Sequence, residues 1–268
     1  MKLDKEYFDL IKSYKLLANK SLGQNFLVNS DVCSSIVNAL NIVEGDKVIE
    51  IGAGLGSLSY YLAKNPAEVT LIDVDERMLS FLNDQFKDLD NVIIKRENIL
   101  KSDLNKYTKV IGNLPYYITT GSIEYILLNA VNSSNIVLMV QKEVAAKLQD
   151  KKEISPLSIL LNYVAKLEPV MKVSANNFAP MPHVDSAVIR IIPNENIKNA
   201  SNKSVYKLMC NMFLHRRKTI LNCLTNYTHD KEYASQILEK LGTNPLARPE
   251  QLGIEFYIEL NNILKKKD

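Results

Sequence analysis

Cysteine and histidine are scarce in this sequence, with only three of each among 268 residues. Cys33, Cys210 and Cys223 are odd in number and far apart, so they indicate neither a disulfide framework nor a zinc-binding spacing. We therefore expect no metal site built from His and Cys ligands. Unpaired cysteines also fit a reducing compartment.

Long apolar runs are absent as well. No stretch has the roughly 20 consecutive apolar residues that a membrane-spanning helix needs. The N-terminal segment MKLDKEYFDLIKSYKLL carries Asp4, Glu6 and Asp9 among its lysines, so it resembles neither a secretory signal nor a transit peptide. We predict a cytoplasmic protein without a membrane partner. The net charge is only +3, so any RNA-binding surface must concentrate its basic residues locally.

Short apolar segments alternate with segments of helical periodicity over the first part of the chain. Predicted strands are KVIEI at 47–51, VTLIDVD at 69–75, NVIIKREN at 91–98, TKVIGNLP at 108–115 and NIVLMVQ at 135–141. We also predict later strands of the same sheet at 157–173 and 186–193. Strands that alternate with helices and are apolar on both faces indicate an α/β architecture with a parallel, doubly wound sheet.

A polar segment, NENIKNASNKS at 194–204, separates this region from one whose periodicity is helical throughout. We predict a first domain over residues 1–195, with an N-terminal helical extension over 1–20. A small helical domain is predicted over residues 200–268.

Glycines cluster in EIGAGLGS, where Gly52 and Gly54 lie between a predicted strand and a predicted helix. Glycine lets the backbone approach a ligand closely. The pattern E-x-G-x-G-x-G differs from the dinucleotide fingerprint G-x-G-x-x-G and resembles the loop of methyltransferases that use S-adenosylmethionine (SAM). Asp73 ends the next predicted strand, where a carboxylate can accept hydrogen bonds from ribose hydroxyls. Asp75 is a nearby competitor, and a helix N-cap is the structural alternative for Asp73.

The segment NLPY, Asn113 to Tyr116, follows the fourth predicted strand, at the sheet edge where ligands bind in such folds. An exocyclic adenine amine is a weak nucleophile because its lone pair is delocalised into the ring. If the Asn113 side-chain oxygen and the Leu114 carbonyl accept its hydrogens, the lone pair can point at a methyl group. Pro115 restricts the backbone and so aims that carbonyl, while Tyr116 can stack on the base, worth about 1–3 kcal/mol. The alternative is a turn whose residues serve backbone geometry alone.

Six motifs in order resemble the KsgA group of ribosomal RNA adenine dimethyltransferases, between Lys20 and Leu264. They are KSLGQNFL, IEIGAGLGSLS, NLPYYITT, MVQKEVAAKL, FAPMPHVDSAVIR and FLHRRKTILNCL. The resemblance implies a Rossmann-like, SAM-dependent methyltransferase fold with a small all-helical C-terminal domain. It also implies a monomer that dimethylates two adjacent adenosines near the 3′ end of small-subunit rRNA, in an immature 30S-type particle.

The resemblance, together with the glycine loop, assigns roles to individual residues. The SAM-binding set is Asn25, Leu27, Gly52, Gly54, Asp73, Asn98 and Asn113. The catalytic set is Asn113, Leu114, Pro115, Tyr116 and Phe178, with the two aromatic rings on either side of the target adenine. Phe178 has the alternative of a core residue, and Asn25 that of a helix cap or turn residue.

The basic segment HRRK belongs to the second predicted domain. Arg216 and Arg217 follow Phe213 by three and four residues, in the phase of an apolar helical stripe. Because charges are rarely buried unpaired, the segment either pairs with acids or opens onto a groove for phosphate; a solvated face is the third alternative. The resemblance favours RNA binding by Arg216, Arg217 and Lys218.

Some residues depart from the pattern of the group. Asn98 stands where the group usually has Asp. The adenine amine of SAM would then donate to an uncharged amide oxygen, without charge assistance, so the affinity for SAM would be lower. Asp73 replaces the commoner Glu, and Gly121 replaces a usual Pro.

Other functions remain open from the sequence. Large-subunit adenine methyltransferases that confer macrolide resistance share NLPY-like loops, although HRRKT and RPEQL favour the small-subunit group. Transcription and assembly factors on the same fold bind without catalysis. A dehydrogenase that uses NAD is a more distant alternative.

Overall fold

The chain divides into two compact units. The first contains Met1–Gln149 and Lys166–Asn194, and the second contains Asp150–Ala165 and Glu195–Asp268. The second unit thus includes residues 150–165, which the predicted division at 195–200 assigns to the first domain. The computed structural model describes residues 4–13, 24–150, 152 and 154–265, so parts of the predicted N-terminal extension, 1–3 and 14–20, lie outside the described residues.

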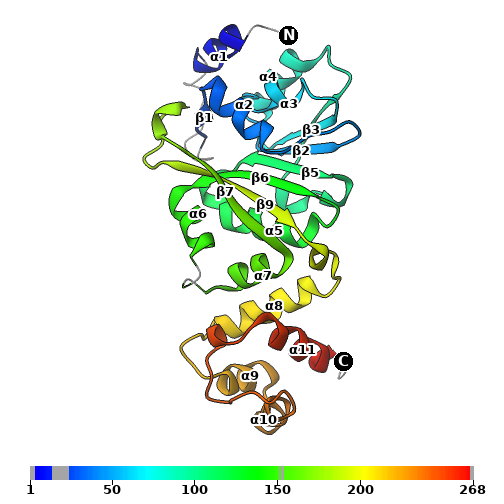
Figure 1. Ribbon diagram of the computed structural model, residues 1–268, viewed down its shortest axis with the longest axis vertical. Helices are drawn as coiled ribbons and strands as arrows, with labels where there is room; N and C mark the ends of the chain where they lie inside the picture. The colour runs from blue at the N-terminus through cyan, green and yellow to red at the C-terminus, as the bar shows by residue number, and fades with distance from the viewer. Residues whose placement is uncertain (1–3, 14–23, 151, 153, 266–268) are drawn as a thin grey trace. The chain divides into compact units, whose positions relative to one another are not determined.

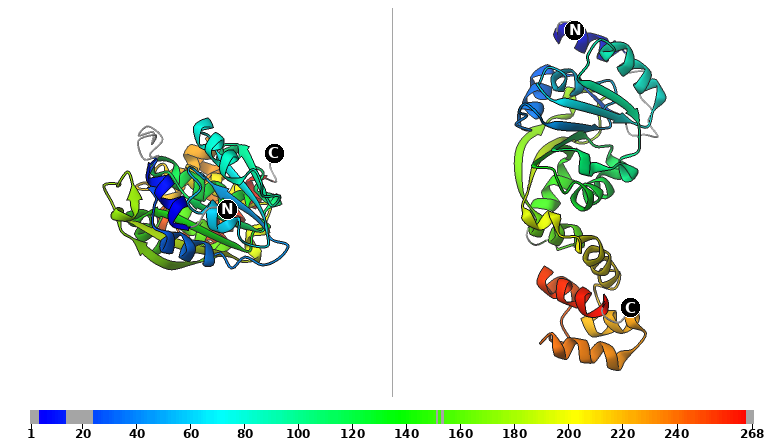
Figure 2. Two further views of the ribbon diagram at one scale, coloured as in Figure 1. Left: turned by 90° about the horizontal axis from the view of Figure 1, so that it is seen from above. Right: turned by 90° about the vertical axis from the view of Figure 1, so that its right-hand side faces the viewer.

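A seven-stranded sheet forms the centre of the first unit, with helices around it (Figure 1). Its strand order is β4-β3-β2-β5-β6-β9-β7, and the sheet is twisted (Figure 2). The strands are β2 Lys47–Ile51, β3 Glu68–Asp73, β4 Val92–Arg96, β5 Lys109–Asn113, β6 Asn135–Gln141, β7 Ala165–Val173 and β9 Ser186–Pro193. A separate antiparallel pair is formed by β1 Phe26–Leu27 and β8 Phe178–Ala179.

Parallel pairing brings the carboxyl ends of the central strands to one edge of the sheet. β2 lies between β3 and β5, and Ile51 is paired with both Ile72 and Gly112. The residues that follow, Asp73 and Asn113 among them, therefore lie side by side at this edge. The strand order also reverses between β2 and β5, the kind of position at which doubly wound sheets bind ligands.

One predicted strand is in part a helix. Residues 157–173 are predicted as strand, but Pro156–Val164 forms helix α7 and only Ala165–Val173 forms β7. Ser155 and Ser158 make a reciprocal capping box, and Pro156 occupies the first turn. A short apolar run fits a buried helix as well as a buried strand. The residues that distinguish the helix here are the capping pair Ser155 and Ser158, together with Pro156.

The predicted parallel pairing is found for β4, β3, β2, β5 and β6, whereas β9 runs antiparallel to β6. Parallel neighbours need a long crossover, usually a helix. The connection between β7 and β9 carries only a 3-10 turn and the short strand β8. The sheet is therefore mixed, while the predicted α/β architecture is confirmed.

Helices and 3-10 turns make up the rest of the first unit. They are α1 Asp4–Ser13, α2 Ser30–Asn38, α3 Ser59–Leu62, α4 Glu76–Phe86, α5 Thr119–Asn129, α6 Lys142–Gln149, η3 Ile99–Lys101, η4 Leu104–Lys106, η5 Tyr116–Ile118 and η6 Ala175–Asn177.

Helix α1 packs against the glycine turn. The Tyr7 hydroxyl donates to the backbone carbonyls of Leu55 (3.1 Å) and Gly56 (3.3 Å). Its ring stacks on Tyr60, with 4.5 Å between ring centroids. Gly56 has a φ of +76°, and a Cβ atom there would lie 2.5 Å from the Tyr7 hydroxyl oxygen. Both backbone conformation and this contact therefore require glycine.

The second unit is helical. Its elements are α7 Pro156–Val164, η7 Glu195–Lys198, α8 Asn202–Phe213, α9 Ile220–Thr228, α10 Lys231–Lys240, η8 Pro249–Gln251 and α11 Ile254–Lys265. Leu208, Met209, Leu224 and Leu238 are buried together with Tyr257, whose hydroxyl donates to the Pro249 carbonyl at 2.7 Å. Across the described part of the chain, no helix has both the length and the apolar character needed to cross a membrane.

The basic segment does not lie on a helix, contrary to the predicted stripe. Helix α8 ends at Phe213, and Thr219 caps the start of α9 by accepting a hydrogen bond from the Asn222 backbone N–H (3.4 Å). Residues 214–218 form an exposed turn between the two helices. Arg216 and Arg217 therefore project from a turn and are not part of the apolar stripe.

The contact between Gly56 and Tyr7 leads to a stability prediction. Gly56→Ala should lower the free energy of unfolding by at least about 2 kcal/mol, because the new methyl group overlaps Tyr7 and φ is left-handed. Gly121→Ala is a matched control: its Cβ would meet nothing within 4 Å, and helix α5 suits alanine. That variant should be stabilised by about 0.4–1 kcal/mol. Urea denaturation followed by circular dichroism measures both, and equal effects would contradict the proposed contact.

Candidate active site

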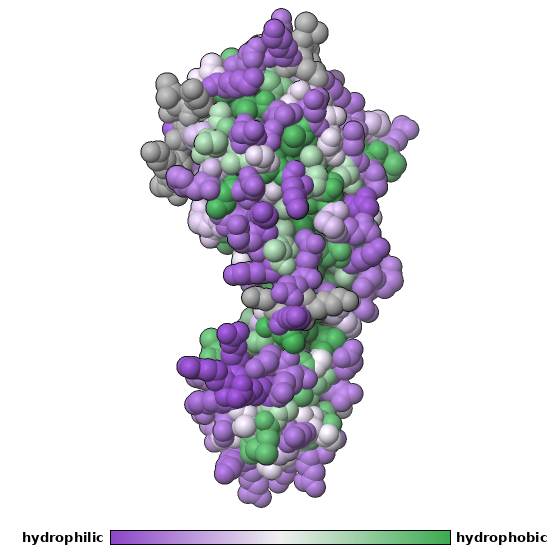
Figure 3. Space-filling view, turned by 60° about the vertical axis from the view of Figure 1, so that its left-hand side comes forward, coloured by the Kyte–Doolittle hydropathy of each residue, from purple (hydrophilic) through white to green (hydrophobic). Residues whose placement is uncertain are grey.

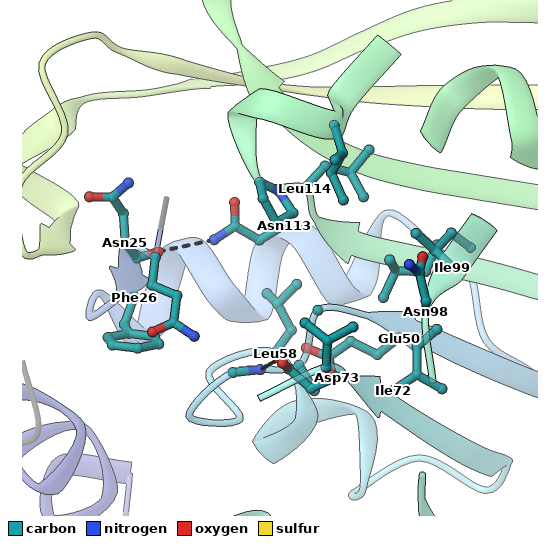
Figure 4. A pocket seen from close by; sticks show the side chains of 18 of the residues that line it. Asn25, Phe26, Glu50, Leu58, Ile72, Asp73, Asn98, Ile99, Asn113 and Leu114 are labelled. Carbon is teal, nitrogen blue, oxygen red and sulfur yellow. Dashed lines mark hydrogen bonds between the residues drawn. The ribbon is translucent and has the colours of Figure 1, made fainter. Parts of the chain in front are cut away.

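A cavity of about 380 Å³ opens at the carboxyl ends of β2, β3 and β5 (Figure 4). This volume lies within the roughly 300–1,000 Å³ of small-molecule sites. Ten residues of the predicted site line it: Asn25, Leu27, Gly52, Gly54, Asp73, Asn98, Asn113, Leu114, Pro115 and Tyr116. Segments far apart in sequence are thus brought together at the point where the strand order reverses.

The glycine turn is held by the strand next to it. The Gly52 N–H donates to the Ile72 carbonyl at 2.9 Å, and the Gly54 N–H donates to Asp73 Oδ2 at 2.8 Å. Gly54 has a φ of +54°, and a Cβ there would lie 3.2 Å from the Phe26 ring. Glycine at this position therefore leaves room for β1 to approach the turn.

Asp73 is buried at the centre of these contacts. Its Oδ1 accepts from the Asp75 N–H at 2.9 Å, while its Oδ2 accepts from Gly54. Burial raises the pKa of the Asp73 carboxyl, against the opposing effect of these backbone hydrogen bonds. Each oxygen keeps a second lone pair, so the carboxylate can still accept from a ligand hydroxyl.

Asp75, the competing acid, has a different environment. It is the N-cap of α4, pairs with Arg77 at 2.5 Å and accepts from Gln24 at 3.1 Å. The hydrogen bond from the Arg77 side chain lowers the pKa of Asp75. Asp75 is not among the residues that line the cavity. The helix N-cap role, which the sequence left open for Asp73, belongs to Asp75.

Asn98 lies on the wall after β4. Its Oδ1 accepts from the Leu100 N–H at 2.9 Å and so caps the 3-10 turn η3. The side chain therefore has a fixed orientation at the cavity, with one lone pair of this oxygen already engaged.

The Asn113 side chain is oriented by the segment that precedes β1. Its Nδ2 donates to the Asn25 backbone carbonyl at 3.2 Å, which turns its Oδ1 away from Asn25 (Figure 4). The Leu114 N–H donates to the Met139 carbonyl at 3.1 Å. Among the described residues, no group donates to the Leu114 carbonyl. Two oriented acceptors thus lie on one turn.

The backbone after Asn113 is anchored on both sides. The Pro115 carbonyl accepts from the Ile118 N–H at 3.1 Å and from the Thr119 hydroxyl at 3.0 Å. Tyr116 is half-buried, and its hydroxyl lies 3.1 Å from the Ser186 hydroxyl oxygen on β9. Burial raises the pKa of Tyr116. The Tyr116 ring is therefore tied to the sheet while it lines the cavity.

Phe178 is the one predicted catalytic residue that does not line the cavity. It pairs with Leu27 across the β1–β8 ladder, is 5% exposed and belongs to the hydrophobic core. Contact with a ligand in the cavity would require the ring to leave this packing. The structure thus places Phe178 in the core, the alternative that the sequence left open.

Glu50 is a site residue that sequence reasoning did not assign. It lines the cavity, is 2% exposed and accepts a hydrogen bond from the Ser59 hydroxyl at 2.5 Å. Burial raises the pKa of Glu50 to about 8. Its position directly before the glycine cluster was the signal that could have identified it.

The charge of the wall decides which ligands fit. Glu50, Asp73 and Glu97 line the cavity, and no Lys, Arg or His does so among the described residues. A pyrophosphate would meet this acidic wall without a counter-ion, whereas a cationic ligand whose ribose hydroxyls donate hydrogen bonds fits these carboxylate acceptors. SAM has both features. The described residues also contain no group of three or more His, Cys, Asp and Glu that could hold a metal ion.

The predicted RNA-binding residues belong to the second unit. Arg216, Arg217 and Lys218 are exposed, and none of the ion pairs found among the described residues includes them. Figure 3 shows strongly hydrophilic side chains gathered on one face of this unit, in the lower half of the view. Pairing with acids, one of the three alternatives for this segment, is thus not found in the described part of the chain.

Comparisons of structure show the fold that this chain shares with other proteins. A dimethyladenosine transferase from Plasmodium falciparum superposes with a TM-score of 0.74 at 24% identity, covering 89% of this chain and 97% of that one. The 23S rRNA methyltransferase ErmE superposes with a TM-score of 0.64 at 22% identity, covering 90% and 100%. These similarities establish the methyltransferase fold.

Comparisons of sequence identify the family. Proteins named ribosomal RNA small subunit methyltransferase A are 36% identical in Bacillus pumilus, over 96% of this chain and 95% of theirs, and 36% identical in Lachnoclostridium phytofermentans, over 98% and 97%. The family described as ribosomal RNA adenine dimethylase matches residues 15–266. The predicted resemblance is thereby confirmed, and the chain belongs to the ribosomal RNA adenine dimethylase family.

Proposed function

We propose that this protein transfers methyl groups from SAM to the exocyclic N6 amines of two adjacent adenosines near the 3′ end of small-subunit rRNA, during ribosome biogenesis. The observation that carries the proposal is the hydrogen bond from Asn113 to the Asn25 carbonyl. It orients the Asn113 oxygen as an acceptor in an acidic cavity, on the same turn as the Leu114 carbonyl. The family supports rRNA adenine as the substrate.

The two acceptors explain how the chain activates a weak nucleophile. Each accepts one hydrogen of the amine, so the nitrogen lone pair is directed away from the adenine ring. When bound, SAM supplies a methyl group on a positively charged sulfur. Positive charge develops on the amine during transfer, and the oxygen atoms of Asn113 and Leu114 stabilise it. The methylated amine then loses one proton to the solvent, which leaves one hydrogen on the nitrogen for the second transfer. No nucleophilic side chain is needed, because positioning carries the reaction.

The remaining cavity residues hold the cofactor and the base. Asp73 accepts from the ribose hydroxyls, Asn98 from the adenine amine of SAM, and Gly52 and Gly54 let the backbone approach. Asn25 and Leu27 close the cavity from β1. Tyr116 stacks on the target base, which must first leave its neighbours in the RNA. Phe178 would join that stack only after leaving the core.

The small subunit is favoured as the target by the names of the relatives that are 36% identical over nearly the whole chain. The likeness to ErmE concerns the fold alone. We propose an immature 30S-type particle in the cytoplasm as the partner, bound by a monomer. Arg216, Arg217 and Lys218 contact phosphates of the rRNA in this proposal.

Transfer from labelled SAM tests the function directly. The protein should methylate immature small subunits and leave large subunits unlabelled, and mass spectrometry should find dimethyladenosine at two adjacent positions. Asn113→Ala should reduce the rate at least about a hundredfold, because the oriented acceptor is lost. Asn83→Ala is a matched control, since this side chain bonds only the Leu79 carbonyl on α4. Labelling of large subunits, or a fully active Asn113→Ala variant, would contradict the proposal.

Asn98→Asp should tighten SAM binding by about fivefold. A carboxylate keeps the cap on the Leu100 N–H and adds charge assistance to the bond from the adenine amine, worth about 1 kcal/mol. Isothermal titration calorimetry measures the change. Asp103→Asn alters a similar cap, on the Asn105 N–H outside the cavity, and should leave SAM affinity unchanged. Weaker binding by Asn98→Asp would exclude this role for residue 98.

Replacing Arg216, Arg217 and Lys218 together by Gln should weaken rRNA binding and flatten its salt dependence. Each lost phosphate contact lowers the slope of log K against log salt by about 0.7–0.9. Filter binding at several salt concentrations gives the slope. Replacing Lys231, Lys240 and Lys265 together by Gln, on α10 and α11 of the same unit, is the control that removes the same net charge. An unchanged slope in the triple variant would show that this turn is only a solvated face.

A further inference from the structure

The Glu50 carboxyl is a buried acid without a cationic partner among the described residues. It is 2% exposed and lines the cavity, yet its one hydrogen bond is the 2.5 Å contact from the Ser59 hydroxyl. None of the ion pairs in the described part of the chain includes it. Buried carboxylates are normally paired, so this one calls for an explanation.

The described groups around Glu50 offer no positive charge. Asp73 faces it from β3, Tyr7 from α1 and Cys33 from α2, and each of these is neutral or acidic. On β5, Lys109 pairs with Asp46 at 3.9 Å. Asp46 lies before β2 and Glu50 near its end, so this lysine is engaged at the opposite end of the strands. The protein surroundings therefore oppose a negative charge at Glu50.

The protein surroundings of Glu50 favour the neutral acid. Burial raises the pKa of Glu50 to about 8, against the opposing effect of the Ser59 hydrogen bond, while Asp73 raises it further. At neutral pH the carboxyl is therefore mostly protonated. A cation placed in the cavity would supply the missing opposite charge and favour the ionised form.

We propose that Glu50 is the counter-ion of the bound cofactor, and that binding of cationic SAM ionises Glu50 and releases its proton to the solvent. In this step a protonated carboxyl and a free cation become a carboxylate–cation pair, and one proton passes to the solvent. The proposal rests on the proposed function, because it takes SAM as the ligand. Glu50 would thereby select for a positively charged cofactor. Asp73 is less able to do so, because both of its oxygens already accept hydrogen bonds from backbone N–H groups.

Calorimetry can count the released proton. SAM is titrated into the wild type and into Glu50→Gln at neutral pH, in phosphate and in Tris, two buffers with different heats of ionisation. The wild type should release most of one proton more than Glu50→Gln, since any proton lost by SAM itself is common to both. Gln preserves the shape of Glu and can accept from Ser59, and a thermal melt verifies that the variant is folded.

Affinity as a function of pH gives a second readout. As the pH rises from about 6 to about 8, the affinity of the wild type for SAM should increase relative to that of Glu50→Gln, by up to about tenfold per pH unit. The reason is that, at higher pH, Glu50 has already lost the proton that must leave on binding. Tyr7→Phe keeps the ring stack on Tyr60 and removes the other hydroxyl that faces Glu50. This control should release the same proton as the wild type.

Equal proton release by the wild type and Glu50→Gln, or parallel pH profiles, would overturn the proposal. If Glu50→Gln fails to fold, Ser59→Ala provides the test: loss of the hydrogen bond that favours the ionised acid should shift the pH profile of SAM binding upwards. An unshifted profile would likewise overturn it. Failure of the wild type to bind SAM at any pH would instead contradict the proposed function.

Discussion

The cavity depends on one buried carboxylate, Asp73, which accepts hydrogen bonds from the backbone on both of its oxygens. One bond holds Gly54 in the glycine turn and the other holds Asp75 at the start of α4. The loop after β2 and the loop after β3 are thus joined through a single side chain. Because a hydrogen bond to a charged group is worth about 1.5–3 kcal/mol, this joint stabilises the two loops that frame the cavity.

A second joint connects the segment before β1 to the NLPY turn. Asn113 is held by the Asn25 carbonyl, and the two-residue strand that follows Asn25 pairs with β8. The proposed cofactor side and the proposed substrate side of the cavity therefore share one short segment of backbone. Movement of that segment would disturb the Asn113 side chain and the cavity wall together, so the two parts of the proposed site are coupled.

Much of the fold followed from the sequence, because strands such as KVIEI and NIVLMVQ are short, apolar and separated by helical periodicity. The error at residues 157–164 arose where hydrophobic pattern alone fits helix and strand equally, and where Ser155 and Pro156 carried the decisive signal. The reversed direction of β9 depends on a connection whose path is tertiary, so local pattern did not reveal it.

The candidate site was likewise predictable only in part from the sequence. Glycine spacing and the NLPY turn located the cavity, since both follow predicted strands of one sheet edge. Which of Asp73 and Asp75 lines it depends on side-chain direction, and the burial of Phe178 depends on the β1–β8 pair. Glu50 was overlooked because its unusual environment comes from groups on α1, α2 and β3, which sequence spacing does not bring together.

The contact between Tyr7 and Gly56 has a consequence for the evolution of the family. Helix α1 covers the turn so closely that a side chain at position 56 and a hydroxyl at position 7 cannot occupy the same space. The two positions should therefore vary together: a relative that has lost glycine at 56 should also have lost the tyrosine hydroxyl at 7, or the helix that carries it.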